Sequence, residues 1–257
     1  MRDRNRPAAI LLDFGGVLVD VHYRPDGLAE VAAEVERLLR RSSGSKLAAA
    51  RIEADLQAGW RAYHDWKDSE ARRPRPREIG HREFWADLVA ADWPPAARSA
   101  VAAHAWPLCQ LLDVATKDRP PKIGALELLQ KLQDLGIRTG CVSNSLGAAG
   151  SRALMREYGF EELLGIQVYS DEVGIRKPNP EIFLLAATSL DVEPGDCWYV
   201  GDTRDRDVVG GRRAGLGRVI LMISTESGTG AYASIEPDVI VERPADLLAL
   251  LGAEASA

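Results

Sequence analysis

The spacing of apolar residues divides the chain into two regions. From residue 25 to about residue 113, apolar positions recur at three- and four-residue steps, as in Ala29–Leu39 and Leu47–Trp66. This period is typical of amphipathic helices, and further helices are expected at Phe84–Val89 and Ala96–Leu112. The first region shows no convincing strand pattern. The sequence therefore predicts an all-helical segment here.

Short apolar runs alternate with helical segments in the rest of the chain. Strands are expected at 8–13, Ile137–Val142, Ile166–Tyr169, Cys197–Val200, Val219–Ile223 and Val239–Val241. Helices are expected at Ala125–Leu135, Gly147–Tyr158, Pro180–Leu190, Val208–Ala214 and Pro244–Leu251. This alternation predicts a parallel sheet with helices on both faces. The predicted fold is α/β, a three-layer Rossmann-like core (1–22 and 114–257) interrupted by a helical insert (23–113).

Composition narrows the class of protein. The chain has 257 residues, of which 46% are hydrophobic and 27% charged, as expected of a soluble globular protein. A net charge of −6 argues against nucleic acid as the main partner, and no apolar stretch approaches the roughly 20 residues that span a bilayer. Three scattered cysteines and an opening segment without an apolar region predict a cytoplasmic setting. The sequence favours neither a monomer nor a homodimer.

A carboxylate follows the first predicted strand. Asp13 ends the apolar run 8–12 and precedes Gly15 and Gly16. Ligands bind beyond the carboxyl ends of strands in open parallel sheets, and glycines let the backbone approach a ligand closely. Asp13 therefore suits a nucleophile or a metal ligand, although an ordinary turn after a strand explains the same residues.

Three later segments carry polar residues at comparable positions. Ser143 and Asn144 follow a strand, where they suit either phosphoryl binding or a helix N-cap. Lys177 lies in a loop stiffened by two prolines, which would fix its ammonium; a solvated lysine is the alternative. Asp202 follows an apolar strand and a glycine, with Asp207 five residues later. A solvated surface position is a sufficient explanation for Asp207, but it is a weaker one for Asp202.

Together these segments resemble the four motifs of the haloacid dehalogenase superfamily, which is mostly phosphatases. The matching segments are Asp13-Phe-Gly-Gly-Val-Leu, Val142-Ser-Asn, Arg176-Lys-Pro-Asn-Pro and Val200-Gly-Asp-Thr-(x)3-Asp207. The resemblance covers the whole predicted core, and the insert resembles the family's type 1 cap. The chain is also similar to a sugar-1-phosphatase-like branch and to the N-terminal phosphatase of epoxide hydrolases.

The resemblance implies an Mg²⁺-dependent phosphatase that acts on a small phosphorylated metabolite, such as a sugar phosphate, through an aspartyl-phosphate. Asp13 is the implied nucleophile, and Lys177 is the cation that neutralises charge beside it. The implied phosphate-binding residues are Gly15, Ser143, Asn144 and Lys177, and the implied metal ligands are Asp13, the Gly15 carbonyl, Asp202 and Asp207. Electrostatics agrees, because a carboxylate approaches a phosphate only where cations offset the repulsion.

One position departs from the resemblance. Family phosphatases usually carry a second aspartate, a general acid and base, two residues after the nucleophile, where this chain has Gly15. The dehalogenases, phosphonoacetaldehyde hydrolase, the ion-pumping ATPases and the sugar-1-phosphatase-like branch also lack it. General acid–base help contributes about 10²–10⁴-fold. A good leaving group or a substitute such as His22, Asp20 or a residue of the cap would compensate.

Other functions remain open at this level. A non-catalytic member would bind a phosphometabolite or a protein partner, with Gly15 marking lost turnover. Dehalogenases need no Mg²⁺ and replace the acidic fourth motif, so Asp202 and Asp207 favour phosphoryl transfer. Phosphonoacetaldehyde hydrolase adds a cap lysine that forms a Schiff base; a solvated helix face explains the candidates Lys46 and Lys67.

The predicted cap should select the substrate. Its aromatic residues lie at helical spacing, which favours core packing over a stacking surface. Its basic stretch could contact a second anionic group, although a solvated loop explains it as well. The aromatic set is Trp60, Tyr63, His64, Trp66, Trp85 and Trp106, and the basic set is Arg72, Arg73, Arg75 and Arg77.

Overall fold

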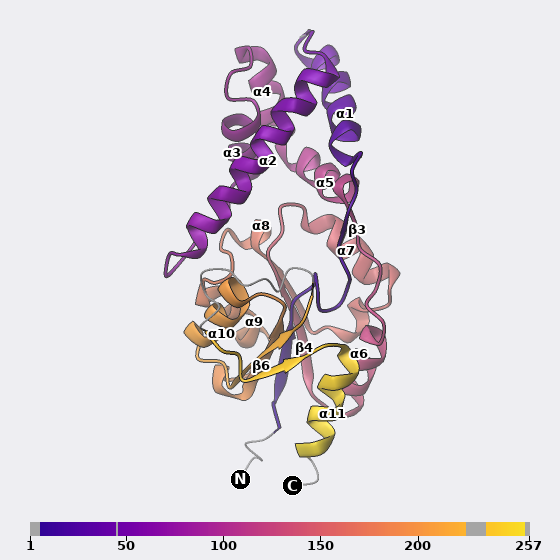
Figure 1. Cartoon of the computed structure of the whole chain (residues 1–257), viewed down its shortest axis with the longest axis vertical. Helices are drawn as coiled ribbons and strands as arrows, with labels where there is room; N and C mark the ends of the chain where they lie inside the picture. The colour runs from indigo at the N-terminus through magenta and orange to yellow at the C-terminus, as the bar shows by residue number, and fades with distance from the viewer. Residues whose placement is uncertain (1–5, 45, 225–234, 255–257) are drawn as a thin grey trace.

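A six-stranded parallel sheet forms the base of the molecule (Figure 1). The computed structural model describes residues 6–44, 46–224 and 235–254. The strand order is β5-β4-β1-β6-β7-β8, with all neighbours parallel. The strands are β1 (Ala9–Leu12), β4 (Arg138–Ser143), β5 (Ile166–Tyr169), β6 (Cys197–Gly201), β7 (Arg218–Met222) and β8 (Val239–Val241). The predicted parallel α/β fold is confirmed.

Helices cover both faces of this sheet. They are α6 (Ala125–Asp134), α7 (Ala148–Glu157), α8 (Ser170–Val173), α9 (Pro180–Ser189), α10 (Val209–Arg213) and α11 (Pro244–Glu254). Short helical turns lie at Glu161–Leu163, Pro194–Asp196 and Arg204–Val208. On one face Leu128 of α6 and Leu247 of α11 pack with Ile10. On the other, Phe183 of α9 packs with Leu11. Because both faces are covered, β1 is buried along its whole length.

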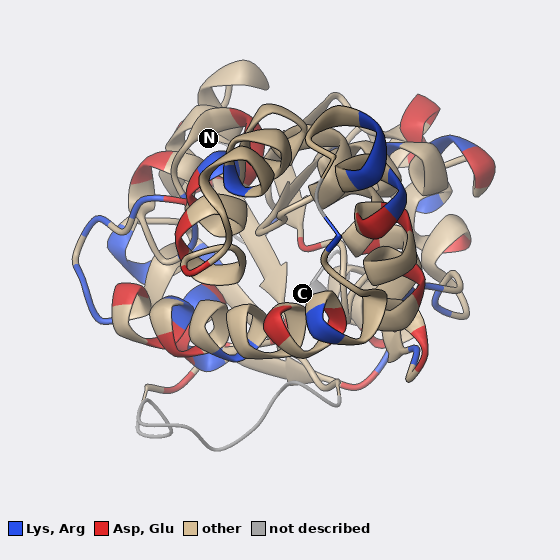
Figure 2. Cartoon of the chain, turned by 90° about the horizontal axis from the view of Figure 1, so that it is seen from above, with Lys and Arg blue, Asp and Glu red and all other residues tan. Residues whose placement is uncertain are grey.

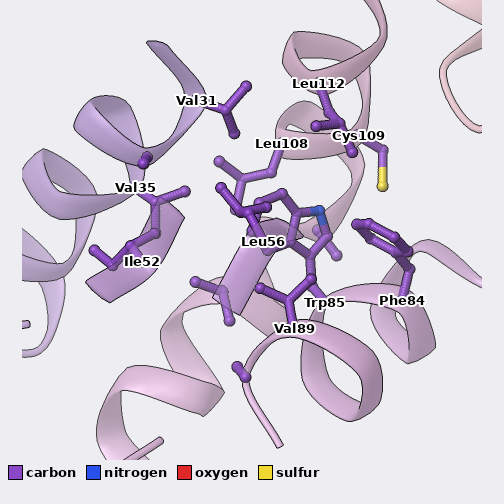
Figure 3. Packing of buried hydrophobic residues seen from close by; sticks show 14 of the residues in the cluster. Val31, Val35, Ile52, Leu56, Phe84, Trp85, Val89, Leu108, Cys109 and Leu112 are labelled. Atoms are coloured by element: carbon purple, nitrogen blue, oxygen red, sulfur yellow. The ribbon is translucent and has the colours of Figure 1, made fainter. Parts of the chain in front are cut away.

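The segment before α6 is helical, as predicted, and lies above the sheet (Figure 1). It contains α1 (Gly27–Ser42), α2 (Ala49–Ala71), α3 (His81–Glu83), the π-helix Phe84–Val89, α4 (Pro95–Ala103) and α5 (Ala105–Thr116). Figure 3 shows its own apolar core, in which Trp85 lies among Leu56, Val89 and Leu108. We call these helices the cap; their folding as a separate domain with the predicted boundaries stays a prediction.

Two details of the cap differ from the prediction. The helix expected over Ala96–Leu112 is two helices, because the chain leaves helical geometry at His104 (φ −109°, ψ 17°) and Pro107 offers no N–H to continue the first helix. The two segments that join cap and core pair as short antiparallel strands, β2 (His22–Tyr23) and β3 (Lys117–Asp118). A strand of two residues is too short to show an alternation of apolar and polar positions, so the sequence did not predict these strands.

The surface carries charges of both signs. Figure 2 shows basic and acidic segments interspersed along the helices seen from above. Among the described residues, no helix combines the length and apolar character needed to cross a bilayer. Cys109, Cys141 and Cys197 are buried free thiols.

Candidate active site

The carboxyl ends of three neighbouring strands bring the predicted polar residues together. Leu12 of β1 lies in register with Cys141 of β4 and with Val200 of β6. Asp13, Ser143 and Asp202 therefore end or follow adjacent strands and line one cavity beneath the cap. The cavity measures about 200 Å³.

Lys177 links two carboxylates at the base of this cavity. Its Nζ lies 2.6 Å from Oδ2 of Asp13 and 2.8 Å from Oδ1 of Asp207, and it donates a hydrogen bond of 2.8 Å to the hydroxyl of Tyr199. Burial alone would lower the pKa of Lys177, but the charges of Asp13 and Asp207 outweigh it, and the pKa rises. The ammonium is therefore a permanent positive charge.

Asp207 is held by donors on both of its oxygens. Oδ1 accepts from the hydroxyl of Tyr199 at 2.8 Å, and Oδ2 accepts from the backbone N–H and the hydroxyl of Thr203 at 2.9 and 2.5 Å. Burial would raise the pKa of Asp207, but Lys177 and Arg206 outweigh it and lower the pKa to about 2. Asp207 therefore stays ionised and anchors Lys177.

The pKa values of Asp13 and Asp202 shift in the opposite direction, chiefly because of burial. Burial raises the pKa of Asp13 despite the nearby Lys177. Burial and the charges of Asp13 and Asp207 raise the pKa of Asp202 to about 7, although Ser224 donates a hydrogen bond of 2.6 Å to it. One oxygen from each of the three aspartates lies within 4.8 Å of the others. These crowded, buried carboxylates form a donor set suited to a hard divalent cation.

Two glycines make room for these carboxylates. A Cβ on Gly16, whose φ is +75°, would lie 2.2 Å from Oδ2 of Asp202. A Cβ on Gly201 would lie 2.4 Å from Cβ of Asp207. A Cβ on Gly15 would lie 3.2 Å from Cγ2 of Val21, so Val21 packs beside the position of the missing aspartate.

Asn144 contacts the backbone of Lys177 twice. Its Nδ2 donates to the Lys177 carbonyl at 3.1 Å, and its Oδ1 accepts from the Lys177 N–H at 2.8 Å. The Asn144 side chain therefore positions the lysine, and it also borders the cavity with Ser143.

The cap contacts the lysine-bearing loop through residues 76–79, which we call the strap. Glu78 forms a buried ion pair with Arg176 at 3.1 Å and accepts from the Ser170 hydroxyl at 2.5 Å. The carbonyl of Pro76 accepts from Nδ2 of Asn179 at 3.1 Å. The residues on both sides of Lys177 and Pro178 are thus bound to the cap.

The aromatic residues of the cap divide between two roles. Trp85 is fully buried in the cap core, and Trp106 is 57% exposed. Trp60 and Tyr63 border the cavity, where Asp20 and His22 also lie.

Several residues at the site were not predicted. Tyr199 lies within a strand buried on both faces, which has no polar–apolar period, and Ser224 is 22 residues from its partner Asp202. Glu78 lies in a stretch that composition marks as solvated. For Tyr199 the sequence offered one signal, a tyrosine two residues before Gly201 in an otherwise apolar run.

Comparison with known proteins identifies the family. The family model for haloacid dehalogenase-like hydrolases matches residues 7–215. The chain belongs to this family. The resemblance predicted from the four motifs is therefore confirmed, while the roles of the individual site residues stay predictions.

The relatives include named phosphatases. The chain is 33% identical over 135 residues to glyceraldehyde 3-phosphate phosphatase of Methanopyrus kandleri, covering 50% of this chain and 55% of that protein. It is 30% identical over 124 residues to phosphoglycolate phosphatase of Xanthomonas campestris, covering 48% and 55%. The chain thus spans about half the length of the curated relatives it matches.

A solved structure supports the fold over almost the whole chain. CbbY from Rhodobacter sphaeroides, in complex with phosphate, aligns with a TM-score of 0.63 at 20% identity. The alignment covers 96% of this chain and 99% of CbbY.

Replacing Arg176 with Met should destabilise the protein by about 3 kcal/mol, because Glu78 would stay buried without its cation. Urea denaturation measures this loss. The control Arg75→Met removes the exposed pair with Glu181 (3.2 Å) and should cost less than about 1 kcal/mol. Equal losses in the two variants would contradict the importance of the buried pair.

Proposed function

We propose that this chain is an Mg²⁺-dependent phosphatase that hydrolyses a small phosphorylated metabolite, a sugar phosphate being one candidate, through an aspartyl-phosphate on Asp13. The observation that supports this best is the ion pair of 2.6 Å between Asp13 and Lys177, in a cluster with the buried Asp202 and Asp207 next to the cavity. The names of the phosphatase relatives agree with it. We retain a cytoplasmic setting as part of the prediction.

The proposed reaction has two displacements at phosphorus. A carboxylate oxygen of Asp13 forms a bond to phosphorus while the bond to the leaving oxygen breaks, and that oxygen takes a proton from solvent water. Water then attacks the aspartyl-phosphate, which releases inorganic phosphate and restores the carboxylate. Lys177 would offset the negative charge between Asp13 and the phosphoryl group. Ser143 lines the same cavity, and its hydroxyl would bind a phosphoryl oxygen.

The residues present fit an Mg²⁺ ion. Asp13, Asp202 and the Gly15 carbonyl would hold it, with Asp207 supporting the site, and all are hard oxygen donors. Burial and then the negative charges of Asp13 and Asp207 raise the pKa of Asp202, and a divalent cation would offset that negative charge. An ion held by these residues would supply positive charge that offsets part of the phosphoryl group's negative charge.

The rival functions have less support. A binding protein has no need of a lysine buried between a strand-end aspartate and a second carboxylate. Dehalogenases replace the acidic fourth motif, whereas Asp202 and Asp207 belong to the acidic cluster here. The cluster therefore favours phosphoryl transfer over dehalogenation. A phosphonatase would need a cap lysine that forms a Schiff base, and Lys67 is the candidate that lines the cavity. Its ammonium lies 4.9 Å from the ring centroid of Tyr63.

Replacing Asp13 with Asn should reduce turnover by on the order of 10⁴-fold or more, because an amide cannot serve as the attacking oxygen. Steady-state hydrolysis of p-nitrophenyl phosphate with Mg²⁺ measures the loss, and circular dichroism checks the fold. The control Asp118→Asn alters an exposed carboxylate of the linker and should keep the parent rate. Undiminished Mg²⁺-dependent turnover by Asp13→Asn would remove Asp13 from the mechanism.

Replacing Asp202 with Asn should raise the Mg²⁺ concentration for half-maximal activity by about ten- to a hundredfold, because a charged ligand is lost. Calorimetric titration with Mg²⁺ gives a second readout independent of turnover. The matched control is Asp205→Asn, which changes a carboxylate of the same loop outside the cluster. If both variants bind Mg²⁺ like the parent, the metal assignment is wrong.

Because Gly15 offers no acid, phosphorylation should slow steeply as the pKa of the leaving alcohol rises. A series of aryl phosphates in single-turnover experiments measures this slope. Gly15→Asp should flatten the slope, and the isosteric control Gly15→Asn should not, because an amide donates no proton to the leaving oxygen. A shallow slope in the parent that steepens when His22 or Asp20 is replaced would instead identify a substitute acid.

A further inference from the structure

Three cations from separate parts of the chain line the cavity that contains Asp13. Lys67 comes from α2 of the cap, Lys117 from the linker strand β3, and Arg206 from the loop after β6. Lys177 is the cation in direct contact with Asp13 and Asp207. Arg206 pairs with Asp205 at 3.8 Å, and its charge also acts on Asp207.

The three cations converge on one wall of the cavity. His64 of α2, which the cap packs beside Trp60, is close enough to all three for their charges to act on it. Burial, followed by the charges of Lys67, Lys117 and Arg206, lowers the pKa of His64 to about 4. His64 is therefore neutral at physiological pH and adds no fourth charge.

Aromatic rings form the same wall. Nζ of Lys117 lies 6.0 Å from the ring centroid of Trp60, and Nζ of Lys67 lies 4.9 Å from that of Tyr63. Trp60, Tyr63 and Lys67 are spaced at three and four residues and so share one face of α2. The wall thus combines apolar rings with ammonium groups.

Two cations share one carboxylate beside Lys117. Lys117 pairs with Asp113 at 3.1 Å, and the same carboxylate pairs with Arg119 at 2.6 Å. One buried carboxylate therefore serves two cations. Nε of the buried Arg119 has no hydrogen-bond partner among the described residues.

The basic stretch singled out in the sequence lies elsewhere. Arg73, Arg75 and Arg77 pair with Glu70, Glu181 and Glu83 at 3.0, 3.2 and 2.6 Å. Neither these three nor Arg72 line the cavity. The capacity to bind an anion has to be sought on the wall formed by Lys67 and Lys117.

We propose that Lys67 and Lys117 bind a second anionic group of the substrate, a carboxylate or a phosphate, at the end remote from the transferred phosphoryl group. Trp60 and Tyr63 pack against the carbon skeleton between the two charges. The substrate is then a phosphorylated acid or a bisphosphate. This inference rests on the proposed function, and it narrows the substrate class.

The test compares aryl phosphates with matched leaving groups. The probes are 3-(carboxymethyl)phenyl phosphate, its primary amide and 3-(phosphonooxymethyl)phenyl phosphate, each with its one-carbon-longer homologue. We expect kcat/KM for an anionic probe to exceed that of the amide by about tenfold or more at low salt, and the ratio to shrink as salt is added. The better of the carboxylate and phosphate probes identifies the second group.

Variants test the assignment to particular residues. Lys67→Gln and Lys117→Gln should each lower the ratio of anionic to amide kcat/KM several-fold, mainly through KM, because charge-assisted contacts are lost. The matched control Lys131→Gln changes an exposed lysine of α6 and should keep the parent ratio. The ratio of anionic to amide kcat/KM and its salt dependence are measured on the parent protein. The proposal therefore remains testable even if a variant misfolds.

Two outcomes would overturn the proposal. One is an equal kcat/KM for anionic and amide probes in the parent protein. The other is a preference that survives both lysine substitutions. If unsubstituted phenyl phosphate is not hydrolysed, the proposed function fails, and this failure is separate from the present proposal. Calorimetric binding of the same acid and amide pairs then tests whether the wall holds a second anion.

Discussion

The ammonium of Lys177 is the interaction on which the site depends. It lies within 2.8 Å of two carboxylates that would otherwise repel each other in a buried environment. Its backbone is bound by Asn144 from the core, and its neighbour Arg176 is bound by Glu78 from the cap. The position of this one charge therefore depends on both halves of the molecule.

The sequence predicted the parts of the site that follow strands. Asp13 and Asp202 could be found because a polar residue directly after a buried parallel strand lies at the ligand-binding edge of the sheet. Tyr199 could not be found, because every residue of its strand is buried and the apolar residues show no alternation. The sequence therefore does not reveal that its hydroxyl binds Asp207. Glu78 could not either, since its cation lies 98 residues away and local composition there resembles a solvated loop.

Helix α2 shows why helical spacing alone left the cap's aromatic residues ambiguous. Leu56 and Gly59 face the cap core, where Gly59 abuts Val89, while Trp60 and Lys67 border the cavity. Tyr63 lies between these faces and belongs to both. A helix between a core and a cavity has apolar residues on two sides, so the same spacing serves packing and ligand contact.

The strap has a consequence for evolution and engineering of the insert. Because Pro76 and Glu78 supply partners of Asn179 and Arg176, a foreign helical insert grafted between the two linkers would remove the acceptor of Asn179 Nδ2 and the carboxylate that pairs with Arg176. Such a chimera would have to import the residues 76–79 with the new helices or replace Arg176 at the same time. The cap and the geometry of the loop that carries Lys177 are therefore coupled in this chain.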